Sequence, residues 1–189
     1  MPVTGSEVVV LVDDSDHEIG VTEKLSAHRS GKLHRAVSIF AFDPSFRRLL
    51  LQRRNPHKYH SGGLWANTCC GHPRPGEKAE AAALRRLNEE MGVSTQLVFA
   101  FSHMYRLSLG AGMYEHEYDH IFVGTLGSSP PTPDPAEVIE TKWVDVALLA
   151  DQLSSHETTY AVWFRELWPR MMDWIDTKDM VMGLTRPTV

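Results

Sequence analysis

The chain has 189 residues, of which 42% are hydrophobic and 23% charged, the balance of a globular protein that buries a core without disulfides or structural metal ions. No apolar run reaches the roughly 20 residues needed to span a bilayer. A formal net charge of −5 argues against a general nucleic-acid binder, which needs a basic face. We therefore expect one domain over residues 1–189, with no membrane span and no nucleic-acid partner.

The first part of the chain predicts short strands joined by turns. An apolar run at residues 8–12 predicts a strand, a polar turn follows at residues 13–20, and residues 21–28 continue polar. Residues 36–42 and 49–52 are two further strand segments on either side of a turn. We expect these two segments to pair as a β-hairpin.

The clearest helix is predicted at residues 77–91. Leu84 and Leu87 supply its apolar face, and Gly92 is a typical terminating residue. Two less regular segments precede it: a basic loop rich in glycine and histidine at residues 53–63, and an extended or irregular stretch at residues 64–70.

The remaining elements mix strands with a few helices. Strands are predicted at residues 96–102, 118–126 and 140–146, a proline-rich loop at residues 128–135, and helices at residues 147–153 and 159–175. Mixed strands with few helices predict an α+β fold built as an α/β sandwich.

Cys69 and Cys70 are the only cysteines. Neighbouring cysteines rarely form a disulfide, because a trans dipeptide does not provide the required geometry. We therefore expect two free thiols in a reducing compartment, which indicates a cytoplasmic protein. In an extended segment the side chain of Cys69 points away from that of Cys70, so Cys69 is expected to be a buried structural thiol.

Residues 71–93 have a distinctive spacing at the start of the predicted helix. Gly71 is followed after five residues by Glu77 and after seven more by Arg85. Carboxylates one turn apart on a helix can hold a hard divalent cation against a diphosphate. The spacing resembles the Nudix box, whose last positions are here Leu87, Glu89, Glu90, Gly92 and Val93.

One position departs from that box. The box has a glutamate after Arg85, and this chain has Arg86. Hydrolases of the Nudix family use the carboxylates of this helix to gather metal ions, so an arginine weakens such a cleavage site. Its guanidinium can bind phosphate oxygens directly. Arg86 and Glu90 lie four residues apart on one face, so we expect one to bind a diphosphate and the other to anchor Mg²⁺ to it.

The segments around the box extend the resemblance. The run Asn67–Pro73 precedes it, two histidines lie upstream, and the triplet Glu115-His116-Glu117 lies downstream. Together they resemble the type 1 isopentenyl diphosphate isomerases, over about residues 8–146. The resemblance implies a Nudix-type α/β/α sandwich with a mixed sheet. It also implies an enzyme of isoprenoid biosynthesis that interconverts isopentenyl diphosphate and dimethylallyl diphosphate, which are small allylic and homoallylic diphosphates.

The resemblance also implies the roles of individual residues. Cys70 and Glu117 would be the proton-transfer pair, and Tyr105 a supporting hydrogen-bond donor. A transition metal such as Mn²⁺ or Zn²⁺ would bind His28, His34, His72, Glu115 and Glu117, and Glu90 would hold Mg²⁺. The diphosphate would contact Lys24, Arg54, Lys58 and Arg86.

Strand geometry and ligand chemistry are compatible with this set. Glu115 and Glu117 are two residues apart on a strand, so both can reach one ion. Three imidazoles with two carboxylates suit Zn²⁺ or Mn²⁺, whereas a diphosphate prefers Mg²⁺. The remaining histidines are expected to be ordinary surface or core residues: His57, His60, His103, His116, His120 and His156.

Aromatic side chains are expected around a cationic intermediate, which a π-face stabilises. Trp65 is a candidate wall of the substrate pocket. Tyr160 is expected at the position where the family places a tryptophan, and it too offers a π-face. Core packing is expected for Trp163, Trp168 and Trp174.

Two other functions are compatible with parts of the sequence. A Nudix hydrolase of a nucleoside diphosphate derivative shares the box, but Arg86 and the His/Glu cluster count against it. A Nudix-like module without activity would not need Cys70, Glu117 and Tyr105 together. No flavin phosphate loop is visible. We expect a monomer or a weak homo-oligomer.

Overall fold

The computed structural model describes residues 7–127 and 130–182. At its centre lies strand β3 (His34–Phe42), which is buried along almost its whole length. It runs parallel to β8 (Met113–Thr125) and antiparallel to β6 (Cys69–Gly71), so the sheet is mixed. A strand with apolar side chains on both sides needs cover on both faces of the sheet.

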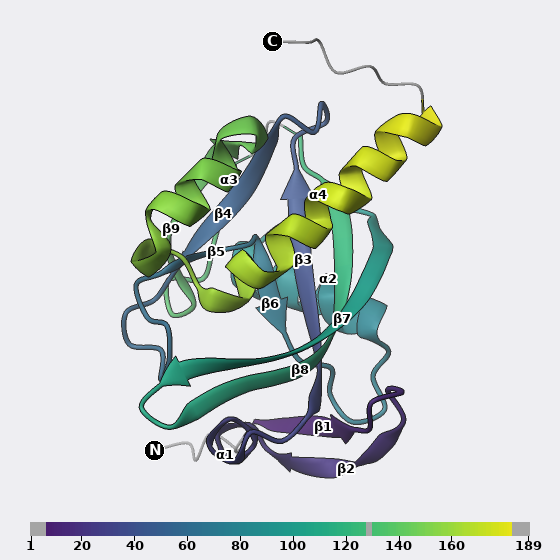
Figure 1. The fold of residues 1–189 in the computed structure, drawn as a ribbon, viewed down its shortest axis with the longest axis vertical. Coiled ribbons are helices and arrows are strands. Elements are labelled where there is room, and N and C mark those ends of the chain that lie inside the picture. Colours follow the sequence, from purple (N-terminus) through teal and green to yellow (C-terminus); the bar gives the residue numbers. More distant parts are fainter. Residues whose placement is uncertain (1–6, 128–129, 183–189) are drawn as a thin grey trace.

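Helices provide that cover on both sides. Val37, Ile39 and Ala41 pack with the helix α2 (Ala79–Met91) on one face. Phe40 and Phe42, which alternate with them along β3, pack with the opposite helices. Those are α3 (Val146–Ser155) and α4 (Val162–Met182), and Figure 1 shows them on one side of the sheet with α2 on the other. The predicted α/β/α sandwich with a mixed sheet is confirmed.

A long hairpin projects beyond the central sheet. Strands β7 (Leu97–Gly110) and β8 pair antiparallel over almost their full lengths, and Figure 1 shows the hairpin reaching toward the β1–β2 end of the molecule. Its turn needs three left-handed residues, Gly110, Ala111 and Gly112, at φ of 79°, 49° and 73°. The predicted strands at residues 96–102 and 118–126 are therefore too short. The missing residues at the turn end of the hairpin mix polar with apolar side chains, and in β8 the buried Glu115 and Glu117 alternate with more exposed residues.

The prediction for the residues before β3 is only partly right. Strand β1 (Val8–Val12) is confirmed, but residues 13–20 are not all turn, because β2 (Glu18–Glu23) pairs with β1. The short helix α1 (Lys24–Ser30) follows and ends at Gly31 in a left-handed conformation. The only large apolar side chains of β2, Ile19 and Val21, are both exposed, so the strand has too short an apolar alternation to be predicted with certainty from its sequence.

Two other boundaries differ from the prediction. Strands β3 and β4 (Arg48–Arg54) share one register pair, whereas β4 pairs along its length with β9 (Val138–Asp145). The predicted hairpin is thus only a narrow contact. Helix α4 begins at Val162 rather than at residue 159, and a 3₁₀ turn, η1 (Glu157–Thr159), precedes it. The short strand β5 (Trp65–Ala66) pairs with β4.

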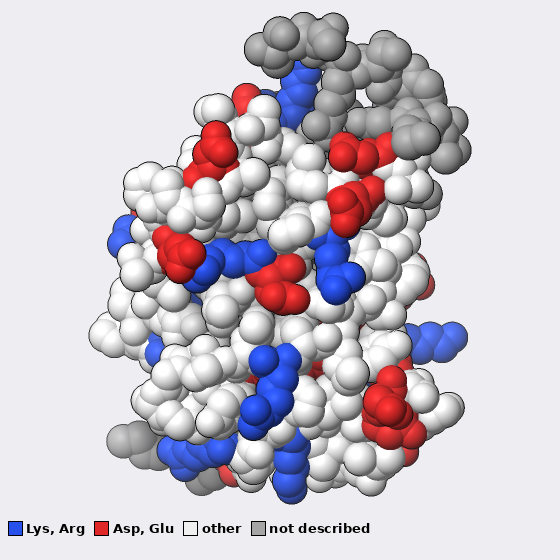
Figure 2. Space-filling view, viewed as in Figure 1, with Lys and Arg blue, Asp and Glu red and all other residues white. Residues whose placement is uncertain are grey.

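The surface charge and the composition of the helices can be compared with the expected lack of a nucleic-acid partner and of a membrane span. The face seen in Figure 2 carries acidic and basic side chains interspersed with each other. Within residues 7–127 and 130–182, no helix is long and apolar enough to cross a membrane. Residues 128–129 of the predicted proline-rich loop lie outside the described part of the chain.

Candidate active site

A cavity of about 240 Å³ lies beside the first half of β8. Its wall combines β6 and the following loop, the box helix α2, helix α1, and the loop between β4 and β5. Glu115, Glu117 and Asp119 are buried along one side of β8, because alternate residues of a strand point the same way. Glu115 and Glu117 line the cavity.

Histidines from three separate segments face these two carboxylates. His28 Nε2 lies 2.9 Å from Glu115 Oε2, and His72 Nε2 lies 3.0 Å from Glu117 Oε1. His34 Nε2 lies 3.6 Å from the same oxygen of Glu117. The five predicted metal donors therefore converge. They do so in two groups that share His28: one with His34, His72 and Glu117, the other with Glu115 and His60.

The ring protons of His28 and His34 favour a bound cation. His28 Nδ1 lies 2.7 Å from the Lys24 carbonyl and His34 Nδ1 lies 2.8 Å from the Lys32 carbonyl, so each Nδ1 carries the proton. In a neutral ring Nε2 then presents a lone pair, which repels a carboxylate unless a cation lies between them. His34 Nε2 is buried without a hydrogen-bond partner. This is the usual tautomer of a metal-ligating histidine, and it fits a divalent metal ion.

The two glutamates differ in protonation tendency. Burial raises the pKa of Glu115, and the neighbouring Glu117 charge adds to the shift. Burial acts in the same direction on Glu117, but the imidazoles of His34 and His72 hold the pKa of Glu117 well below its usual range. Glu117 is thus the carboxylate that stays ionised in this cluster.

The Cys70 thiol lies at the cavity edge and is held by two polar groups. It donates to Asn67 Oδ1 at 3.2 Å and lies 3.6 Å from Ser38 Oγ. Burial, and then the Asp119 charge, raises the pKa of Cys70 to about 12, so the group is a protonated thiol. Cys69 is fully buried on the other side, with Sγ 3.4 Å from Glu90 Oε2. The predicted opposite orientation of the two cysteines is confirmed.

The Tyr105 hydroxyl connects two carboxylates of β8. It donates to Glu117 Oε2 at 2.5 Å and lies 3.2 Å from Asp119 Oδ2. The same Asp119 oxygen accepts from Ser38 Oγ at 2.7 Å. Sequence reasoning missed Asp119, although it continues the alternation of Glu115 and Glu117 by one more step.

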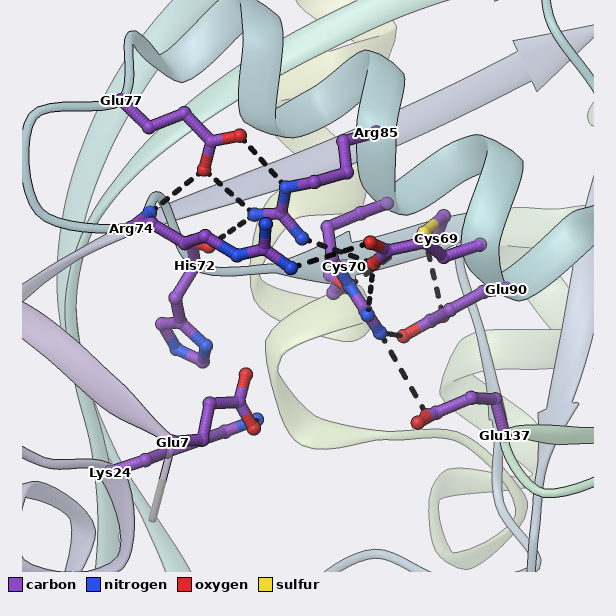
Figure 3. A network of polar contacts seen from close by, with 12 residues as sticks. Glu7, Lys24, Cys69, Cys70, His72, Arg74, Glu77, Arg85, Glu90 and Glu137 are labelled. Carbon is purple, nitrogen blue, oxygen red and sulfur yellow. Dashed lines mark hydrogen bonds and ion pairs between the residues drawn. The ribbon is translucent and has the colours of Figure 1, made fainter. Parts of the chain in front are cut away.

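Cationic side chains occupy the opposite part of the cavity. Arg86 forms an ion pair with Glu90, and Lys58 forms one with Glu137. Glu90 and Glu137 both face this region in Figure 3. A Cβ at position 71 would lie 2.7 Å from Arg86 Cγ, which explains the glycine that opens the box. All four predicted diphosphate contacts line the cavity: Lys24, Arg54, Lys58 and Arg86.

Other residues of the box fasten the loop that carries His72. Arg85 Nε and Nη2 both lie 2.8 Å from the carboxylate of Glu77, and Nη2 also donates to the His72 carbonyl at 3.2 Å. Figure 3 shows this fork beside His72, with Lys24 and Glu7 on the far side of the imidazole. The spacing of Glu77 and Arg85 therefore positions His72, one of the predicted metal donors.

The aromatic wall differs from the prediction. Trp163 lines the cavity, and the Arg54 Cζ atom lies 5.2 Å from the centroid of its ring. The Trp163 Nε1–H donates to Asn67 Oδ1 at 3.2 Å. Trp65 and Tyr160 do not line it, because they pair with each other in the core and flank the Lys142 ammonium. The turn before α4 places Tyr160 outside the helix, which brings Trp163 to the wall.

His60 was expected to be an ordinary histidine, and the structure places it with His28 and Glu115 in a group that could hold a metal ion. Burial, followed by the charge of Arg54, lowers the pKa of His60 to about 2, so its ring is neutral. No motif in the basic loop distinguishes His60 from His57, which is exposed.

Known proteins resemble this chain over most of its length. The NUDIX domain family matches residues 32–167. Isopentenyl-diphosphate Delta-isomerase 2 of Aromatoleum aromaticum is 51% identical over 155 residues, covering 82% of this chain and 81% of that protein. Isopentenyl-diphosphate Delta-isomerase of Burkholderia multivorans is 48% identical over 158 residues, covering 84% and 89%. A crystal structure from Deinococcus radiodurans has a TM-score of 0.73 at 19% identity, covering 87% of this chain and 98% of that chain, a likeness of fold.

Proposed function

The chain belongs to the Nudix family and, within it, to the isopentenyl-diphosphate Delta-isomerases, and from this premise we propose which residues carry the isomerisation. The enzyme interconverts isopentenyl diphosphate and dimethylallyl diphosphate, a reaction that moves one C=C bond. One observation supports the assignment most strongly. Cys70 and Glu117 come from different strands and line one cavity, which also holds the cationic side chains that a diphosphate needs.

The diphosphate binds at the cationic end of the cavity. Lys24, Arg54, Lys58 and Arg86 supply positive charge, and guanidinium groups bind phosphate oxygens in pairs. Glu90 is nearly buried and faces this end, so it is placed to hold Mg²⁺ with the diphosphate. The ion pair between Arg86 and Glu90 would break on binding, when the guanidinium turns to the diphosphate and the carboxylate turns to the cation.

The histidine cluster holds a second divalent cation, such as Mn²⁺ or Zn²⁺. Its donors are His28, His34, His72, Glu115 and Glu117. When bound, this ion supplies a fixed positive charge that stabilises both carboxylates in their ionised form. The imidazole and carboxylate donors suit a transition metal better than Mg²⁺.

Cys70 and Glu117 exchange two protons with the substrate. In one direction a proton is added to the terminal alkene carbon, and another is removed from the carbon nearer the diphosphate, so the C=C bond shifts by one position. In the reverse direction each group does the opposite. Tyr105 donates to Glu117 Oε2 and holds that carboxylate in place during the transfer.

The Trp163 ring lines the same cavity and offers a π-face to the positive charge that develops between the two proton transfers. Water would trap a carbocation, so the isomerisation requires that no water molecule be placed for attack on the intermediate. A water nucleophile is what a hydrolase requires. The arginine at position 86 also removes a carboxylate from the box helix, so hydrolysis is the less supported reaction.

We further propose that the protein acts in the cytoplasm as a monomer or weak homo-oligomer. A reducing environment keeps Cys70 a thiol. Size-exclusion chromatography with light scattering across a range of concentrations tests the oligomeric state.

The function is tested by incubating purified protein with isopentenyl diphosphate and Mg²⁺ and following both isomers by ¹H NMR. We expect dimethylallyl diphosphate to form until the two isomers reach a constant ratio from either side. Absence of interconversion, with release of phosphate from a nucleoside diphosphate derivative, contradicts the proposal. Cys70→Ala should abolish turnover. Cys69→Ala is the matched control, since that thiol points away from the cavity, and it should keep most of the activity.

A further inference from the structure

His60 lies next to the proposed metal site without being part of the predicted ligand set. It is 8% exposed, and its Nε2 lies 3.5 Å from Glu115 Oε1. Its ring stacks on that of His28 with centroids 5.3 Å apart. The loop that carries His60 is tightly folded, since a Cβ at Gly62 would lie 2.4 Å from the Pro56 carbonyl oxygen. The position of His60 is therefore built into the fold.

The two donor groups cannot hold two separate ions. His28 belongs to both, and the ligand atoms of each group lie within 4.8 Å of one another. His28 Nδ1 is engaged by the Lys24 carbonyl, so only Nε2 is left for a metal. One imidazole nitrogen binds one ion. Donors of both groups can therefore take part only if they share one ion, whose position His28 fixes.

We propose that His60 is a further ligand of this one ion, in addition to the five donors assigned above. The inference rests on the proposed metal site. His60 Nδ1 lies 3.3 Å from Ser61 Oγ, which can accept a hydrogen bond from Nδ1–H. The lone pair of Nε2 then faces the carboxylate and imidazole groups of the cluster. His28 and His34 use backbone carbonyls in the same way.

The added ligand has a chemical consequence. Four imidazoles and two carboxylates form a donor set that strongly favours a transition metal over Mg²⁺. Six protein donors also leave no coordination position for water, as in closed structural metal sites. Such an ion orients Glu115 and Glu117 rather than activating a nucleophile, which agrees with an isomerase.

The test measures Co²⁺ binding to metal-free protein, with the visible absorption spectrum as a report on the ligand set. His60→Gly should weaken Co²⁺ binding by about tenfold or more and change the spectrum. Added imidazole should restore both, because it can enter the space left by the ring. His57→Gly is the matched control in the same loop and should behave as the unaltered protein. Circular dichroism checks the fold, and His60→Gln replaces His60→Gly if the glycine unfolds the loop.

Two results overturn the proposal. One is a His60→Gly protein with the original Co²⁺ affinity and spectrum. The other is weaker binding that imidazole does not restore, which indicates a structural role for the loop. His72→Ala separates these from a failure of the metal site itself. If both His60→Gly and His72→Ala bind Co²⁺ as the unaltered protein does, the proposed metal site is wrong. If His72→Ala loses Co²⁺ and His60→Gly keeps it, only the role of His60 is contradicted.

Discussion

Tyr105→Phe removes a single hydroxyl from the proposed proton-transfer site and keeps the ring. The hydroxyl lies 2.5 Å from Glu117 Oε2 and 3.2 Å from Asp119 Oδ2, while the ring is buried in the core. Phenylalanine fills the same volume, so the fold should persist. The variant therefore isolates one hydrogen bond to a buried carboxylate.

The size of the effect follows from that hydrogen bond. A hydrogen bond to a charged group contributes about 1.5–3 kcal/mol. At about 1.4 kcal/mol for each factor of ten in rate, its loss during proton transfer lowers kcat by about 10- to 150-fold. KM should change by less than about twofold, because the hydroxyl's hydrogen-bond partners are carboxylates rather than the cationic side chains.

Initial rates by ¹H NMR at varied isopentenyl diphosphate give kcat and KM separately. Tyr118→Phe is the matched control, since Tyr118 follows Glu117 directly on β8 and points to the opposite face. Its kcat should stay within about twofold of the unaltered enzyme. Unchanged kcat in Tyr105→Phe, in a protein with an unaltered melting temperature, would refute the assigned role of the hydroxyl.

Three further predictions follow from other contacts. Arg86→Gln removes a charge at the diphosphate end, so KM should rise by about tenfold or more in the same rate assay, and an unchanged KM contradicts the assignment. Glu77→Gln breaks the partly exposed fork with Arg85, so thermal unfolding should begin about 2–4 °C lower, with weaker Co²⁺ binding through His72. Burial raises the pKa of Cys70 from 9.0 to about 12, so between these pH values the thiol ionises in the unfolded chain but not in the folded protein. The free energy of unfolding is therefore unaffected by this group below pH 9 and falls as pH rises toward 12. In Cys70→Ser, the free energy of unfolding by urea should therefore fall less steeply above about pH 9, by about 1.4 kcal/mol per pH unit; equal slopes would count against the buried thiol.

Local patterns account for the parts of the fold that the sequence predicted. The nearly uninterrupted apolar run of β3 indicates a strand covered on both faces, and the box helix has its terminating glycine and a buried Leu87, although Leu84, also predicted on its apolar face, is exposed. The opposite orientation of the Cys69 and Cys70 side chains follows from strand alternation alone. In each case the determining interactions lie within a few residues of each other.

The missed features depend on contacts between distant segments. His60 becomes a candidate ligand only because its loop folds against α1 and β8, and Trp163 reaches the cavity only because the turn before α4 shifts the helix start. Strand β2 has only two large apolar side chains, Ile19 and Val21, both exposed, and it is held by its pairing with β1. No periodicity in a single segment carries this information.

The most direct test of the central claim measures hydrogen exchange during turnover in D₂O. If Cys70 and Glu117 transfer two separate protons, the new methyl group of dimethylallyl diphosphate should contain deuterium from solvent, detected by ²H NMR or mass spectrometry. Glu117→Gln and Cys70→Ala should each lose both turnover and deuterium incorporation, while Cys69→Ala keeps them. Product formed without deuterium would show that one hydrogen migrates within the substrate, and would contradict the two-group mechanism.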